Sequence, residues 1–193
     1  RVYIMINKPK GTLSTMEDDR GRSSLGDLVS APVRLYPVGR LDVNSEGLIL
    51  LTDDGELANL LTHPRYEHHK EYLALVNGHP SEKTLEAWRR GLLLDDKLTA
   101  PARVGVLRRE RESTWLRVEM REGRKRQIRR VASLLGHPVR ELRRVALGPL
   151  QLGSLASGQW RYLTAREIGQ LESLKQQPKK GKRRRPRRRK WKR

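Results

Sequence analysis

One short polar loop in the sequence carries a carboxylate among basic and turn-forming residues. It reads Gly39-Arg-Leu-Asp-Val-Asn-Ser-Glu-Gly47 and stands directly before the apolar stretch 48–52. An aspartate in such a loop commonly does no more than cap a turn. Asp42 could instead act as a nucleophile, because a neighbouring guanidinium such as that of Arg40 lowers the pKa of a carboxyl group and keeps it ionised. The residues alone leave both interpretations open.

A second candidate is the basic segment Gly123-Arg-Lys-Arg-Gln-Ile-Arg-Arg130, which we expect at the start of a helix. The helix macrodipole disfavours cations at that end, so a helix that served only stability would carry acidic residues there. The segment is either a solvated basic face or a surface whose side chains and amide groups meet RNA phosphates. At helical spacing Arg126, Arg129 and Arg130 share one broad face, so one of them could point inward to a buried carboxylate.

Tyr72, in the segment Lys70-Glu-Tyr-Leu73, is a third candidate in a chain with only 5% aromatic residues. A tyrosine in such a strand packs into the core by default. At a sheet edge or in a cleft it can instead stack on a nucleobase. This signal is weak by itself.

The signatures of several other chemistries are absent from the sequence. It has no phosphate-binding loop, no dinucleotide-binding fingerprint, no His-Glu-x-x-His helix and no cysteine. The adjacent His68 and His69 lack a supporting carboxylate and are better explained as solvated side chains than as metal ligands. We therefore expect neither a metal nor a small-molecule cofactor.

The charge of the chain is high and unevenly distributed. Its 42 Lys and Arg residues exceed its 22 Asp and Glu residues by 20, and 13 of the basic residues lie in 175–193. Such a segment cannot bury enough apolar surface to fold alone, so we expect a globular domain over 1–174 and a disordered, RNA-binding tail over 175–193. The charge favours a nucleic acid as the partner and a monomeric protein. Without cysteines or a long apolar run, we expect a cytoplasmic protein that does not contact membranes.

The elements that would position these residues mix strands and helices without the strict alternation of a parallel sheet. We expect strands at 1–7, 48–52, 71–77, 102–107, 114–120, 141–147 and 160–163, and helices near 24–29, at 53–61, 81–91 and 125–135, and from 164 onward. Capping boxes at Asp53/Glu56 and at Thr164/Glu167 mark two helix starts. Strands 102–107 and 114–120 should form a hairpin. This pattern favours an α+β fold on a mixed, mainly antiparallel sheet with helices packed on it.

Several segments together resemble one enzyme family. They are NKPKG (7–11), GRLDVNSEGLILLT (39–52), KEYLALV (70–76), EGRKRQIRRVASLLGHPV (122–139), LRRVALGPLQLGSL (142–155) and GQWRYLT (158–164). In this order they resemble the RsuA/RluB-type ribosomal RNA pseudouridine synthases over nearly all of residues 2–174. The resemblance implies a catalytic domain with an RNA-binding cleft. It also implies isomerisation of a uridine in ribosomal RNA (rRNA) to pseudouridine without a cofactor or metal.

The resemblance also assigns roles by position. It implies that Asp42 is the catalytic aspartate, that Tyr72 packs against the target base, and that Arg129 pairs with the aspartate. We expect RNA contacts from six basic residues, namely Lys8, Arg40, Arg124, Lys125, Arg126 and Arg130. Large-subunit rRNA is the favoured substrate and small-subunit rRNA the second. A non-catalytic rRNA-binding ribosome-assembly factor would suit the composition equally well.

Relatives in this family often carry an S4-type RNA-binding domain ahead of the catalytic part, and this chain contains none. Because it opens on Arg1 rather than Met, we expect that an upstream segment has been removed.

Overall fold

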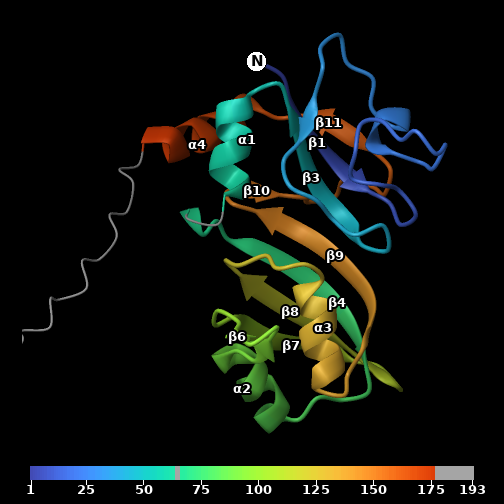
Figure 1. Ribbon diagram of the computed structural model, residues 1–193, viewed down its shortest axis with the longest axis vertical. Coiled ribbons are helices and arrows are strands. Elements are labelled where there is room, and N and C mark those ends of the chain that lie inside the picture. The colour runs from blue at the N-terminus through green and yellow to red at the C-terminus, as the bar shows by residue number, and fades with distance from the viewer. Residues whose placement is uncertain (64–65, 177–193) are drawn as a thin grey trace, which may run out of the picture.

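A nine-stranded sheet runs the length of the structure, a computed structural model that describes residues 1–63 and 66–176 (Figure 1). Its strands are β1 (Tyr3–Lys8), β2 (Tyr36–Pro37), β3 (Glu46–Thr52), β4 (Lys70–Asn77), β7 (Arg103–Arg109), β8 (Ser113–Met120), β9 (Val139–Leu147), β10 (Leu150–Gln151) and β11 (Trp160–Tyr162). Strands β5 (Leu93–Leu94) and β6 (Lys97–Leu98) form a separate two-stranded sheet. The helices are α1 (Gly55–Thr62), α2 (Glu82–Arg90), α3 (Gln127–Leu134) and α4 (Ala165–Gln176), with a 3-10 turn at Leu25–Asp27.

The strand order β11-β1-β3-β9-β4-β8-β7 divides the sheet into two halves that meet where β3 lies beside β9. This is the one parallel pairing among the described strands, and it consists of the residue pairs Glu46–Arg143 and Gly47–Arg144. The other strand pairings in this sheet, as far as it is described, are antiparallel, and β7 and β8 form the expected hairpin. The mixed, mainly antiparallel α+β prediction is therefore confirmed. We call the β3–β9 contact the strand junction.

Each half of the sheet has its own core. In the half that contains β1 and β3, α1 and α4 pack on one face through Leu57 and Leu171. Residues 25–41 cover the other face of that half, where Leu25 and Leu35 pack on Ile49. In the half that contains β4, β8 and β7, α2 and α3 cover the sheet (Figure 1). Strand β1 is buried along its whole length, as its apolar sequence predicts.

Local capping signals place most helix ends. Ser81 accepts a hydrogen bond from the amide of Thr84 at the start of α2, and Thr164 and Glu167 form both arms of the predicted capping box. The predicted cap of α1 was wrong by one residue. Asp54, not Asp53, accepts the amide of Leu57, because the carboxylate of Asp53 is already bonded to the amide of Val2.

Two further features differ from the sequence prediction. Helix α3 begins at Gln127, because Arg126 adopts a left-handed backbone conformation with φ of 52°. A small hairpin of β5 and β6, turning through Asp95 and Asp96, was not anticipated. Both turn residues have positive φ, as a two-residue type I′ turn requires.

Helix α4 continues through Gln176, so the start of the predicted tail is helical, and the ammonium of Lys175 lies 2.7 Å from a carboxylate oxygen of Asp54. The rest of that tail, residues 177–193, lies outside the described residues. In the part of the chain that is described, no helix is long and apolar enough to cross a membrane.

Candidate active site

The loop of residues 39–45, here called the Asp42 loop, leads into β3 at the strand junction. Residues 42–45 form a turn, in which the amide of Ser45 donates to the carbonyl of Asp42 at 2.9 Å. The side chain of Asp42 is about one-third exposed, at 32%. Its carboxylate is therefore reachable by a substrate, while its backbone is fixed in a turn.

Segments distant in sequence hold the first part of this loop. The hydroxyl of Ser14 donates to the carbonyl of Leu41 at 2.7 Å and accepts from the Leu41 amide at 3.0 Å. The carbonyl of Val43 accepts from the amide of Gly11 at 2.9 Å and faces the Lys8 ammonium at 3.4 Å. The residues on either side of Asp42 are thus bonded to the segment that follows β1. Such bonds fix the position of a reacting group before a substrate arrives.

Arg129 holds the second part of the loop. One of its terminal nitrogens donates to the carbonyl of Asn44 at 2.8 Å and to the hydroxyl of Ser45 at 3.1 Å. Burial lowers the pKa of the Arg129 guanidinium, the charge of Arg126 lowers it further, and the charge of Asp42 opposes both. Arg129 therefore lies within the electrostatic field of Asp42, but its Nη2 donates to the backbone carbonyl of Asn44 and the hydroxyl of Ser45.

The ion pair that Asp42 makes among the described residues is with Arg126, at 3.8 Å between Nη1 and Oδ2. The expected direct pairing with Arg129 is replaced by this contact. A terminal nitrogen of Arg129 is bonded to Asn44 and Ser45, whereas Arg126, with its left-handed backbone, lies ahead of the first helical residue. Arg126 is 44% exposed, so it faces both Asp42 and solvent.

Lys8 does not lie on an RNA-binding surface, contrary to the prediction. It is fully buried, and its ammonium lies within 3.4 Å of three backbone carbonyls, those of Pro9, Thr12 and Val43. Burial lowers the pKa of Lys8 to about 8, although the nearby charges of Glu46 and Asp42 oppose the shift. Lys8 is a structural support of the Asp42 loop.

Two of the other predicted RNA contacts are also engaged within the protein. Arg124 donates to carbonyls of the β5–β6 hairpin, at 2.9 Å to Lys97 and 2.5 Å to Leu98. Arg130 makes a bidentate pair with Asp95 at 2.9 and 2.6 Å. Both arginines therefore hold the hairpin against the start of α3. Arg40, Lys125 and Arg126 are exposed, as RNA contacts require.

Tyr72 lies on β4 in the row of residues that crosses the strand junction. Arg144 is paired with Gly47 on one side and with Tyr72 on the other. Neighbouring strands are about 4.8 Å apart, so Tyr72 is about 10 Å from Gly47 across the sheet. Tyr72 is half-buried and packs against the cores of both halves, including the core that contains Leu41. The sheet thus brings Tyr72 to the same junction as the Asp42 loop.

Sequence analysis missed a pair of cations beside Tyr72. Arg144 is 3% exposed, and its Nε donates to the carbonyl of Leu48 at 2.8 Å, in the wedge where β3 and β9 separate. Burial lowers the pKa of Lys70, and the charge of Arg144 lowers it further. Among the described residues neither forms an ion pair with a carboxylate. Lys70 stands two residues before Tyr72 and therefore on the same strand face, which was the one available signal.

The two adjacent histidines are not simply solvated. The imidazole of His69 lies 3.3 Å from Glu119, while burial lowers the pKa of His68. In the described part of the chain, no group of three or more His, Cys, Asp or Glu side chains could hold a metal ion.

Comparison with known proteins identifies the family. Residues 2–134 match the family model described as RNA pseudouridylate synthase. The chain belongs to this family. It is 43% identical over 171 residues to an uncharacterised RNA pseudouridine synthase of Aquifex aeolicus, covering 88% of this chain and 69% of that protein. It is 40% identical over 176 residues to the ribosomal large subunit pseudouridine synthase B of Bacillus subtilis, covering 90% and 72%.

A solved structure described as a pseudouridylate synthase has the same fold. It superposes with a TM-score of 0.80 at 32% identity and covers 88% of this chain and 73% of that one. The chain is thus an RNA pseudouridine synthase, an isomerase whose reaction moves the attachment of uracil from N1 to C5. For such a pseudouridine synthase, a fixed loop with a reachable carboxylate and a neighbouring aromatic ring are suitable parts of a reaction site.

Proposed function

We propose that this pseudouridine synthase modifies a uridine of large-subunit rRNA and that Asp42 is its catalytic carboxylate. The name of the Bacillus subtilis relative supports the substrate. The observation that carries the proposal is the position of Asp42, a partly exposed carboxylate in a loop tied down at Leu41, Val43 and Asn44.

The reaction breaks the bond between uracil N1 and ribose C1′ and joins C5 to C1′, and the hydrogen on C5 is released as a proton. In one route the Asp42 carboxylate attacks C1′ as the N1–C1′ bond breaks, and the ester is later displaced by C5. In the other route it removes the 2′ proton as the N1–C1′ bond breaks, which gives a glycal, and it returns that proton to C2′ when C5 bonds to C1′. In both routes Asp42 needs a fixed position and an anionic form, and the product has the same atoms as the substrate because N1 gains a proton as C5 loses one.

Tyr72 and the exposed cations complete the proposed site. The target nucleotide must leave the RNA stack, and Tyr72 can replace part of the lost stacking. Arg40 and Lys125 are exposed and can meet phosphates, as can Arg126 from its place beside Asp42, and Arg129 positions Asp42 through the loop. This arrangement assigns separate cations to RNA binding and to loop positioning.

Exchanging Asp42 for asparagine tests the assignment, because D42N keeps the size and removes the charge. The matched control is D96N, which makes the same change on an exposed turn where asparagine tolerates the left-handed conformation. Both variants and the wild type are incubated with large-subunit and small-subunit rRNA, and pseudouridines are mapped. We expect product on large-subunit rRNA from the wild type and D96N and none from D42N.

Near-wild-type product from D42N would show that another group does the chemistry. Modification of small-subunit rRNA alone would correct the substrate. RNA binding by the wild type without any pseudouridine would favour the assembly-factor alternative.

A further inference from the structure

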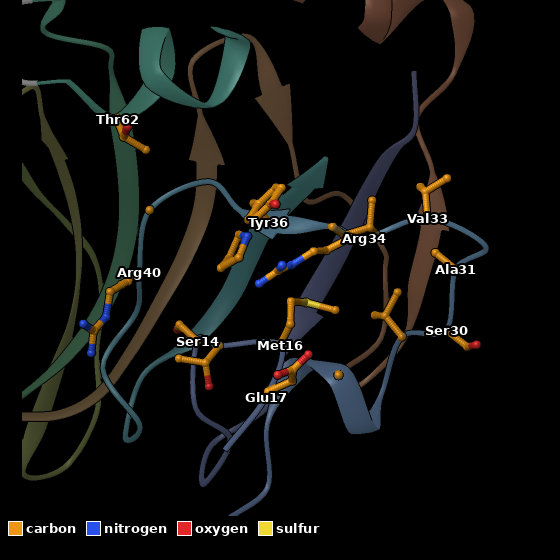
Figure 2. A pocket seen from close by; sticks show the side chains of 16 residues that line it. Ser14, Met16, Glu17, Ser30, Ala31, Val33, Arg34, Tyr36, Arg40 and Thr62 are labelled. Carbon is orange, nitrogen blue, oxygen red and sulfur yellow. The ribbon is translucent and has the colours of Figure 1, made fainter. Parts of the chain in front are cut away.

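An open pocket of about 790 Å³ lies beside the Asp42 loop, and the reaction proposed above does not use it (Figure 2). Its walls come from residues 14–17, 29–31 and 33–37, together with Gly26, Gly39, Arg40 and Thr62. The sequence showed no chemistry in this irregular stretch. The volume exceeds what a single nucleobase fills, and the pocket is open to solvent.

The side chains at the centre of the pocket are of the kinds that bind a flat aromatic group. The guanidinium carbon of Arg34 lies 5.5 Å from the centre of the Tyr36 ring, and that tyrosine is 46% exposed. Figure 2 shows Arg34, Tyr36 and Met16 directed toward the same space. Aromatic rings and guanidinium planes are the surfaces on which unstacked bases pack.

The pocket shares residues and hydrogen bonds with the loop that carries the proposed catalytic residue. Arg40 lies on its rim and Asp42 is two residues further along, a span of at most about 7 Å. Ser14, which lines the pocket, is the residue bonded to both backbone groups of Leu41. The Cα atoms of Arg40 and Asp42 are therefore no further apart than neighbouring nucleotides of an extended strand. A strand whose target nucleotide sits at Asp42 can therefore place its neighbour in the pocket.

We propose that this pocket binds an unstacked nucleobase of the substrate RNA, adjacent to the target uridine, and so helps to select which uridine is modified. The inference rests on the proposed function at Asp42. The base stacks against Tyr36 and Arg34, and Arg40 contacts the phosphate between it and the target. Extrusion of the target leaves its neighbour without a stacking partner, which makes that neighbour available. The positive charges of Arg34 and Arg40 exceed the single negative charge of Glu17 in the lining, so the pocket favours an anionic ligand such as RNA over a neutral one of similar size.

The test combines protein variants with modified RNA. Y36A and R34A are measured on an rRNA fragment that contains the mapped target uridine, and on fragments with an abasic site at each flanking position. The control variants are R108A and W115A, which disrupt an Arg–aromatic pair of similar geometry (5.9 Å) on β7 and β8. Tyr36 and Arg34 are exposed, and R34A tests the same pocket from a residue outside every strand.

We expect Y36A and R34A to raise KM about tenfold or more, the effect of losing one stacked base, with kcat changed less than about threefold. R108A and W115A should leave KM unchanged. One abasic position should raise KM of the wild type by a similar factor and have no further effect on Y36A. This lack of additivity identifies the base that occupies the pocket.

Two results would overturn the inference. The first is an unchanged KM for Y36A and R34A, or additive effects at every abasic position. The second is that Y36A and R34A lose activity on intact ribosomal particles but keep normal activity on the RNA fragment, which would mean that the pocket binds a ribosomal protein. In both cases the wild type still forms pseudouridine. If the wild type forms none, it is the proposed function that fails.

Discussion

Replacing Arg129 by methionine should slow the reaction while leaving the protein folded and able to bind RNA. Methionine keeps an unbranched apolar side chain of similar length, so the half-buried stem of Arg129 remains packed. The change removes the donors to the carbonyl of Asn44 and the hydroxyl of Ser45. Ser45 is 1% exposed, so water cannot easily replace the lost donor there.

The size of the effect follows from the bonds that are lost and those that remain. A hydrogen bond from a charged donor contributes about 1.5–3 kcal/mol. The loop keeps its ties to Ser14, Gly11 and Lys8, so we expect the loss to appear as poor positioning of Asp42 rather than unfolding. If about 2 kcal/mol of that loss reaches the transition state, the rate falls roughly 30-fold.

Release of tritium from uridine labelled at C5 measures the reaction, because C5 loses its hydrogen when the new glycosidic bond is complete. With enzyme in excess over an rRNA fragment, the rate at saturation reports on positioning and its concentration dependence on RNA affinity. R129M should lower the rate and change the affinity less than threefold. R126M is the control, since its exposed ion pair with Asp42 is screened by solvent and should alter the rate less than tenfold.

The reasoning fails if R129M reacts at the wild-type rate, or if it loses affinity alone, which would place Arg129 on the phosphate-binding surface. It also fails if R126M is the slower variant, because direct charge pairing would then matter more than support of the loop.

Four other changes have defined outcomes. Burial raises the pKa of Asp54, but hydrogen bonds from Lys175, the Leu57 amide and the Tyr3 hydroxyl outweigh it and lower this pKa to about 2. D54N should therefore reduce the free energy of unfolding by about 2 kcal/mol at pH 7, and the difference should vanish as pH falls from 3.8 to 2 in urea titrations; a constant difference would contradict this. Lys8 is charged in both the folded and the unfolded protein below pH 8, and between about pH 8 and 10.5 only the unfolded chain keeps the proton. The free energy of unfolding should therefore rise with pH over this range, by at most about 3 kcal/mol. K8M should lack this pH dependence, and an equal dependence in K8M and the wild type would refute the reasoning. A Cβ at Gly47, where φ is 112°, would lie 2.2 Å from a carbonyl oxygen of β9, so G47A should lower the melting temperature and the activity together; an unchanged melting temperature would show that the strand junction can open. Deleting 177–193, which leaves α4 complete, should reduce the slope of log affinity against log salt without changing the uridine that is modified; an unchanged slope would mean that the tail does not contact RNA.

The features that sequence predicted well are those with a local pattern. Alternation of apolar and polar residues placed β8 within one residue, and the hairpin with β7 followed from adjacency in the chain. The capping box at Thr164 and the glycine stop of α2 at Gly91 depend on residues at most a few positions apart. Such signals act over one or two turns, so they can be recognised without knowing the rest of the fold.

The roles of the basic residues were harder to predict, because their acceptors are backbone carbonyls far away in sequence. Arg124 bonds to Lys97 and Leu98, about thirty residues earlier, and Arg129 to Asn44, 85 residues away. Backbone carbonyls are present at every position and leave no mark in a sequence. The left-handed residue at Arg126 was equally hidden, since no glycine or asparagine indicates it.

This distribution of cations bears on how the charge of the domain is used. Lys8 and Arg129 bond to the Asp42 loop, and Arg144 bonds to Leu48 at the strand junction, so three positive charges lie in or next to the support of the loop, two of them buried and Arg129 half-buried. Neutral donors would satisfy the same carbonyls. Charged donors additionally create a positive potential around the Asp42 loop, which attracts a phosphodiester chain before contact. Only the exposed cations, Arg126 among them, remain for the phosphate contacts proposed above, so the number of phosphate contacts should be well below the number of basic residues.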